Sequence, residues 1–132
     1  MAEQKRTYDS GTTWEALAGY SRAVRYGNQI HVSGTTATDE QGQLVGPGDA
    51  AAQMRYIIAK IERAIHQLGG RLEDVIRTRI YVHHLADWEA VARVHGEHFG
   101  AIRPANTLVQ AQLVGFGYLV EMEAEAIIGP GG

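Results

Sequence analysis

Three glutamates lie near the end of the chain at a spacing of two residues: Glu121, Glu123 and Glu125. The apolar residues among them predict a β-strand, and the side chains of a strand alternate between its two faces. The three carboxylates would therefore share one face. Glu121 stands between Val120 and Met122, and such bulky apolar neighbours disfavour an ionised carboxylate, which suits a general acid or base. A solvated strand face is the simpler explanation of the same row, and the spacing alone favours it.

Other kinds of chemistry find less support in the residue pattern. The 132 residues include no cysteine, which excludes disulfides, thiolate nucleophiles and cysteine-ligated zinc. The pairs His83-His84 and His95/His98 lack the converging ligands of a zinc site, so we expect no metal. No glycine-rich phosphate loop with its lysine occurs. Ser33 has no evident His–Asp partner for a hydrolase triad.

Length and composition are those of an ordinary globular protein, with 45% hydrophobic and 20% charged residues. We expect a single domain, residues 1–132, with loose termini at 1–12 and 129–132. The first ten residues lack the apolar region of a signal peptide, and no run reaches the ~18–20 apolar residues that span a bilayer. We therefore expect a cytoplasmic protein with no membrane contact. The net charge of -3 makes a nucleic-acid partner unlikely, because phosphate binding needs a basic patch.

Hydrophobic periodicity predicts two long helices. Between Asp49 and Leu68, apolar residues recur at helical spacing, with Asp49 as the N-cap and a glycine pair as the stop. A second helix is predicted to follow Asp87, as its cap, and to end at Phe99. A single helical turn is expected over residues 13–17. Each long helix carries an apolar stripe that requires a sheet to pack on.

The remaining segments predict that sheet. A short edge strand is expected at 5–8, and runs at 19–26 and 29–33 flank a Gly-Asn pair that is typical of a β-hairpin. Alternation predicts a strand over 75–82, and residues 102–128 supply two more. The order β-β-β-α-β-α-β-β predicts an α+β two-layer domain with two helices on one mixed sheet. The other sheet face would be uncovered and partly apolar, so we expect a homo-oligomer.

Five segments of the chain form a recognisable set: GYSRAV (19–24), VSG (32–34), LEDVIRT (72–78), RPA (103–105) and VEMEA (120–124). In this order and spacing they resemble the Rid family of reactive intermediate deaminases, also called YjgF-type or L-PSP-type endoribonucleases. The resemblance extends over residues 18–127. It implies a chorismate-mutase-like (YjgF-like) fold assembled as a homotrimer, with the sheets in a central barrel and ligand clefts between subunits.

The best-known Rid proteins hydrolyse enamines and imines to a 2-oxo acid and ammonia without metal or cofactor. The resemblance assigns the water-orienting glutamate to Glu121, a pocket tyrosine to Tyr20, and a backbone segment of the pocket to Ser33 and Gly34. In those proteins an arginine after Pro-Ala clamps the substrate carboxylate as a bidentate fork. Asn106 stands at that position here. Each lost charged hydrogen bond removes about 1.5–3 kcal/mol, so we expect an altered substrate specificity.

Another arginine could substitute for the clamp. Arg79 is our preferred candidate because it shares a strand face with Tyr81, away from the apolar stripe, and could project into the cleft. Arg22 is next to the pocket motif. Arg103 is three residues from Asn106 and is expected on the opposite strand face.

Four further residues are expected to complete the small-molecule pocket. Asn106 together with Thr107 would hydrogen-bond an amide, carbonyl or hydroxyl group of the substrate. Leu108 would provide an apolar wall. Trp88, at the start of the second helix, would add an aromatic wall from the neighbouring subunit or belong to the core.

Three functions remain open at this point. The leading hypothesis is an enamine or imine deaminase of non-standard specificity, because Glu121 and Tyr20 are both present. The alternative is a trimer that binds a small metabolite without turnover. A ribonuclease activity rests only on an old family label, and the acidic charge balance opposes it.

Overall fold

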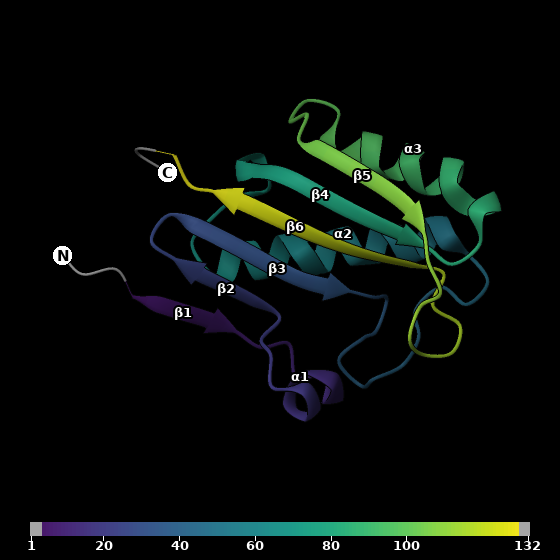
Figure 1. Ribbon diagram of the computed structural model, residues 1–132, viewed down its shortest axis with the longest axis horizontal. Coiled ribbons are helices and arrows are strands. Elements are labelled where there is room, and N and C mark those ends of the chain that lie inside the picture. Colours follow the sequence, from purple (N-terminus) through teal and green to yellow (C-terminus); the bar gives the residue numbers. More distant parts are fainter. Residues whose placement is uncertain (1–3, 130–132) are drawn as a thin grey trace.

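The computed structural model describes residues 4–129, and a six-stranded mixed sheet forms its centre (Figure 1). The strands are β1 (Lys5–Tyr8), β2 (Ala23–Tyr26), β3 (Gln29–Thr35), β4 (Val75–Val82), β5 (Ala105–Gln110) and β6 (Val120–Ile127). Their order across the sheet is β1-β2-β3-β6-β4-β5. All neighbours are antiparallel except β4 and β5. The last strand of the chain, β6, therefore lies inside the sheet between β3 and β4.

Two long helices cover one face of this sheet (Figure 1). Helix α2 (Ala50–Gln67) packs on β3 and β6, and α3 (Trp88–Phe99) packs beside α2. The short helix α1 (Thr13–Ala18) connects β1 to β2. Single 3-10 turns precede β4 (Leu72–Asp74) and α3 (Leu85–Asp87). The predicted α+β architecture with two long helices on one mixed sheet is confirmed, and the helical turn expected over 13–17 is the short helix α1.

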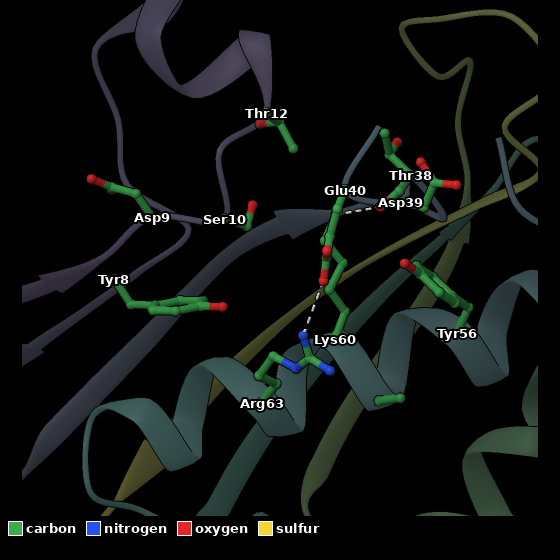
Figure 2. A pocket seen from close by; sticks show the side chains of 11 residues that line it. Tyr8, Asp9, Ser10, Thr12, Thr38, Asp39, Glu40, Tyr56, Lys60 and Arg63 are labelled. Carbon is green, nitrogen blue, oxygen red and sulfur yellow. Dashed lines mark hydrogen bonds and ion pairs between the residues drawn. The ribbon is translucent and has the colours of Figure 1, made fainter. Parts of the chain in front are cut away.

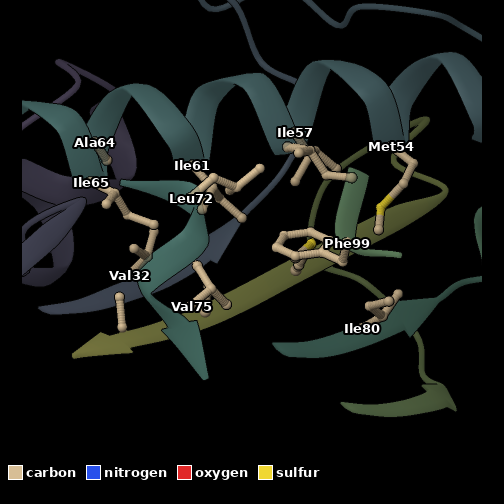
Figure 3. Close-up of a cluster of buried hydrophobic side chains, with 14 of the residues drawn as sticks. Val32, Met54, Ile57, Ile61, Ala64, Ile65, Leu72, Val75, Ile80 and Phe99 are labelled. Atoms are coloured by element: carbon tan, nitrogen blue, oxygen red, sulfur yellow. The ribbon is translucent and has the colours of Figure 1, made fainter. Parts of the chain in front are cut away.

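The apolar stripe of α2 forms the core with the sheet (Figure 3). Met54, Ile57, Ile61 and Ile65 are fully buried, and each such side chain contributes roughly 1.5–3 kcal/mol by leaving water. As predicted, the Asp49 carboxylate caps the helix by accepting a hydrogen bond from the Ala52 N–H at 3.0 Å. None of the helices within residues 4–129 has the length and apolar character of a membrane span.

The N-terminal segment contains the edge strand that the sequence predicted. Residues 5–8 pair with β2, from Lys5 opposite Tyr26 to Tyr8 opposite Ala23. The prediction of a short edge strand at 5–8 is therefore confirmed. Of the predicted loose ends, residues 1–3 and 130–132 lie outside the described residues.

Two predicted boundaries differ for local reasons. The strand expected from residue 19 begins only at Ala23, because Gly19 adopts a left-handed φ of 77° and ends α1. The Asp87 side chain does not cap α3, because Asp87 has helical backbone angles and closes the preceding 3-10 turn instead. Both differences arise where a short turn competes with the longer element beside it.

Strand β6 has two chemically different faces, as its alternation predicted. Four apolar residues face the helices and are at most 1% exposed: Val120, Met122, Ala124 and Ala126. Glu121, Glu123 and Glu125 alternate with them and are partly exposed on the other face. The acids therefore project away from α2 and α3.

Candidate active site

Glu121 is positioned by the backbone of the neighbouring strand β3. Its carboxylate lies so close to Gly34 that a Cβ atom added to this glycine would overlap with Oε2 of Glu121. The β3–β6 register is irregular between Val32 and Thr35, and Gly34 lies in this irregular stretch. The carboxylate can occupy this position only because residue 34 has no side chain.

The environment of Glu121 favours the protonated carboxyl group. Burial raises the pKa of Glu121, the nearby Glu123 raises it further, and Arg22 opposes both effects. No hydrogen bond from the described residues contributes to this shift. The two oxygens are thus free to interact with a water molecule or a ligand.

A cavity of about 260 Å³ opens beside Glu121, and we call it the Glu121 cavity. Gly34 and polar residues from four parts of the chain line it, among them Tyr20, Arg22, Lys60, Tyr118 and Glu121. Trp14, Leu17 and Val114 give it an apolar border. The cavity therefore combines one acid, two cations and two phenols with a surface for an apolar group.

Arg22 connects several parts of this site. Its Nε donates to Oε2 of Glu15 at 3.3 Å, and its Nη1 donates to the Gly34 carbonyl and to Oγ1 of Thr35. Its Nη2 donates to the Tyr20 hydroxyl at 3.3 Å. These four bonds leave only one of five guanidinium N–H groups unassigned. Arg22 is thus a positioning residue and cannot form a bidentate clamp on a substrate without losing them.

The partner of Arg22, Glu15, is a buried carboxylate of α1. Burial raises the pKa of Glu15, but hydrogen bonds from Ser10 and Thr12 and the charge of Arg22 outweigh it and lower the pKa below its ordinary value. Sequence reasoning missed this residue. The spacing Thr12-x-x-Glu15 is a capping-box pattern that could have identified it, although here Thr12 donates to the glutamate side chain.

The predicted backbone segment has a clear structural basis. The Ser33 hydroxyl donates to the Ser21 carbonyl at 2.7 Å, and the Ser33 N–H donates to the Arg22 carbonyl at 2.9 Å. These bonds fix the strand just before Gly34. Ser33 thus holds in place the backbone against which the Glu121 carboxylate lies. Tyr20 lines the cavity directly and is 38% exposed.

Asn106 lies in a different part of the molecule from Glu121. It pairs with Thr78 across β4 and β5, and its Nδ2 donates to Oγ1 of Thr78 at 2.9 Å. The Thr78 hydroxyl is fully buried and lies 2.9 Å from Nε2 of His95 on α3. Burial lowers the pKa of His95. Within one chain, the amide therefore points to the helix-covered side of the sheet.

Thr107 and Leu108 point in opposite directions from their strand. Oγ1 of Thr107 accepts a hydrogen bond from Nη2 of Arg77 at 2.8 Å, whereas Leu108 packs against the core. Consecutive strand residues face opposite sides, so Asn106 and Thr107 do not converge on one substrate group within a subunit. Trp88 is the first residue of α3 and is half exposed.

The structure separates the three arginines that could replace the clamp. Arg79 is paired with two acids of β6, at 3.6 Å from Glu123 and 3.4 Å from Glu125, and it does not line the Glu121 cavity. Arg103 has a left-handed φ of 61° in the turn before β5, so its predicted strand face is wrong. Only Arg22 among these arginines lines the cavity.

A second cavity of about 360 Å³ adjoins the first and shares Thr12, Thr38 and Lys60 with it. Figure 2 shows Tyr56, Lys60 and Arg63 projecting from α2 into this cavity. Nζ of Lys60 donates to the Thr38 carbonyl at 2.9 Å. Within residues 4–129, no group of three or more histidine and acidic side chains is arranged to hold a metal ion.

Comparison with known proteins identifies the relatives of this chain. The family model described as Endoribonuclease L-PSP matches residues 11–128. An uncharacterized protein of Streptomyces coelicolor is 38% identical over 129 residues, which cover 97% of this chain and 96% of that protein. The 3-aminoacrylate deaminase RutC of Acinetobacter baylyi is 37% identical over 110 residues, which cover 83% of this chain and 87% of RutC.

Solved structures agree with these relatives. The crystal structure of Rv2704 from Mycobacterium tuberculosis, described as a member of the YjgF/YER057c/UK114 family, is 42% identical with a TM-score of 0.86. The similarity covers 95% of this chain and all of Rv2704. Sequence and fold match over nearly the whole length, and the chain therefore belongs to the RidA/YjgF family, whose model is described as Endoribonuclease L-PSP.

Proposed function

We propose that the protein is an enamine or imine deaminase in which Glu121 orients the attacking water. The observation that carries this proposal is the carboxylate of Glu121, seated against Gly34 in a cavity with Tyr20 and Arg22. No hydrogen bond from the described residues contributes to the pKa of this carboxyl group, and burial raises the pKa above its ordinary value. The 37% identity to a 3-aminoacrylate deaminase supports the same reaction class.

The chemistry requires one group that accepts and returns a proton. Water adds to the carbon of a C=N bond, Glu121 takes a proton from that water, and the amine leaves as ammonia with a carbonyl product. A carboxylate whose pKa lies closer to the working pH is better suited to both transfers. The burial that raises the pKa of Glu121 therefore also makes its carboxyl group better suited to these proton transfers.

We further propose that the working form is a homotrimer with its clefts between subunits and with a substrate specificity that differs from that of members bearing the clamp arginine. The face of the sheet that carries Arg79, Glu121 and Glu123 lies opposite α2 and α3 and is available to another subunit. In such an assembly a neighbouring subunit would supply Trp88 and the β5 residues to the cleft. Any contact between Glu121 and Asn106 would then join two different chains, because within one chain the Asn106 amide is bonded to Thr78 on the helix-covered side of the sheet.

The test is ammonia release above the spontaneous rate from 2-imino acids and 3-aminoacrylate generated in solution. We expect Glu121→Gln to lower the catalysed rate by at least about 10²-fold, since general acid–base groups contribute about 10²–10⁴. Its urea denaturation should show no loss of stability. An unchanged rate in Glu121→Gln, or ligand binding by the wild type without any ammonia release from the panel, would contradict the proposal and support a binding role.

A further inference from the structure

We infer that Lys60 is a nucleophilic amine of the Glu121 cavity and forms a Schiff base with the carbon of a carbonyl or imine compound bound there. The inference deepens the proposed function and rests on it for the catalytic role of this Schiff base. The reactivity of Lys60 toward carbonyl compounds can be tested separately.

The position of Lys60 supports this role. The residue belongs to α2, but its side chain leaves the helix toward the 38–40 segment and lines both cavities (Figure 2). Its Nζ is held by the bond to the Thr38 carbonyl. A neutral amine can continue to donate this hydrogen bond while its lone pair faces a bound ligand.

The surroundings of Lys60 increase the share of the neutral amine. Burial and the nearby guanidinium of Arg22 lower the pKa of Lys60 to about 8, although Glu15 and Asp39 oppose this change. Glu121 is the acid of the Glu121 cavity. In the second cavity, Arg63 and Glu40 pair with each other at 3.3 Å.

The lowered pKa of Lys60 increases the fraction of its amine that is neutral and can act as a nucleophile. Relative to a lysine at its ordinary value of 10.5, a pKa of about 8 increases the neutral fraction at pH 7 by about 300-fold. A lysine that is desolvated and next to another cation is a recognised form of activated amine. The position of Lys60 in the cavity and its lowered pKa therefore both indicate that its Nζ is the nucleophile.

The reaction balances without a further reactant. The Lys60 amine adds to the carbon of an imine R₂C=NH, ammonia leaves, and the product is R₂C=N–Lys60. Water oriented by Glu121 then hydrolyses this Schiff base to R₂C=O and restores the free amine. A carbonyl compound enters the same Schiff base directly with loss of one water.

The sequence provides its own control, because Lys5 and Lys60 are the only lysines. Lys5 is exposed on the edge strand β1, whereas Lys60 is partly buried and lines both cavities. A reagent that modifies amines by exposure alone would favour Lys5. A reagent that requires an activated amine in a cavity would favour Lys60.

The first experiment treats the wild-type protein with pyruvate and sodium cyanoborohydride, which reduces the Schiff base to a stable amine, and locates the adduct by peptide mass spectrometry. We expect the adduct on Lys60 to exceed that on Lys5 by at least tenfold at pH 7. The rate of Lys60 labelling should level off above about pH 8. Equal labelling of both lysines, or preferential labelling of Lys5, would overturn the inference.

The second experiment compares Lys60→Arg with Lys5→Arg, after circular dichroism has shown both to be folded. We expect Lys60→Arg to lose the adduct and at least about 10²-fold of the ammonia release, while Lys5→Arg retains both. Full ammonia release by Lys60→Arg would remove the catalytic role of Lys60 and leave the proposed deaminase function intact. Selective Lys60 labelling in a protein that releases no ammonia would support the reactive amine and refute the deaminase function.

Discussion

Two carboxylates near Arg22, the buried Glu15 and the partly buried Glu121, have pKa values that shift in opposite directions. This difference distinguishes a carboxylate that supports the structure from one that is suited to chemistry. Glu15 accepts hydrogen bonds from Ser10 and Thr12, and these bonds together with Arg22 outweigh the effect of burial and lower its pKa. Glu121 receives no such contribution, and burial with Glu123 raises its pKa. Burial alone therefore does not set the ionisation of a carboxyl group, because the number of donors aimed at it decides the direction.

The largest effect is expected for Arg22→Met, because this substitution removes the cation that lowers the pKa of both Glu15 and Glu121. Glu15 would then remain buried without an opposite charge, and the bonds to Gly34 and Thr35 would be lost. We expect the free energy of unfolding to fall by about 3–5 kcal/mol, as for other broken buried pairs. Urea denaturation with linear extrapolation measures this change.

A matched control for Arg22→Met is Arg55→Met. The Arg55–Glu97 pair has a similar separation of 3.2 Å, but both side chains are half exposed. Exposed pairs contribute about 0–1 kcal/mol, so we expect little change. Equal effects of the two substitutions would show that the buried pair has no special structural role.

The second prediction displaces Glu121 and leaves Glu15 in place. In Gly34→Ala, the new methyl group would occupy the space of the Glu121 carboxylate, and the flexible end of this side chain must move. We expect ammonia release to fall about 10–100-fold, equivalent to about 1.4–2.8 kcal/mol in the activation barrier. The free energy of unfolding should change by less than about 1 kcal/mol, because a mobile side chain yields at small cost.

The control for Gly34→Ala is Gly96→Ala on α3. A Cβ atom at Gly96 meets no atom within 4 Å, and alanine in a helix is more favourable than glycine by roughly 0.5–1 kcal/mol. We expect this variant to be slightly more stable and fully active. Wild-type ammonia release in Gly34→Ala would show that the position of the Glu121 carboxylate is not critical.

Periodicity predicted the elements and the acidic row because both depend on neighbouring residues along the chain. Helix α2 and the two faces of β6 follow directly from apolar spacings of 3.6 and 2. Periodicity alone, however, favoured a solvated face for Glu121, and only the resemblance to the Rid family assigned it a role in the site. The carboxylate–Gly34 contact, in contrast, depends on an irregular register between β3 and β6, which no local pattern encodes.

Residues brought together from distant segments were the ones that the sequence did not reveal. Lys60 has the same position on the polar side of α2 as an ordinary surface lysine, and only its contact with Thr38, 22 residues away, distinguishes it. Arg22 and Glu15 require α1 to fold back on β2 and β3. Asn106 was expected near Glu121, but its register with Thr78 directs it toward His95.

The smallest expected effect is the pH dependence of the free energy of unfolding in Glu15→Gln, which tests the difference between Glu15 and Glu121. Because the pKa of folded Glu15 is lower than its ordinary value of 4.5, this residue stabilises the fold above about pH 4.5, and the contribution is lost as the pH falls through the folded pKa. Glu15→Gln should therefore lower the free energy of unfolding by about 1 kcal/mol at pH 7, and the difference from wild type should shrink on acidification.

Glu121→Gln should show the opposite sign in the same urea titrations. The pKa of folded Glu121 is raised, so the wild-type residue stabilises the fold most below its unfolded pKa and loses that contribution as the pH rises through the folded value. Relative to the wild type, the Glu121→Gln variant should thus gain stability between acid and neutral pH, whereas the Glu15→Gln variant loses it. Parallel curves for the two variants would mean that the donors around Glu15 do not distinguish it from Glu121, and the division between a supporting and a reacting carboxylate would fail.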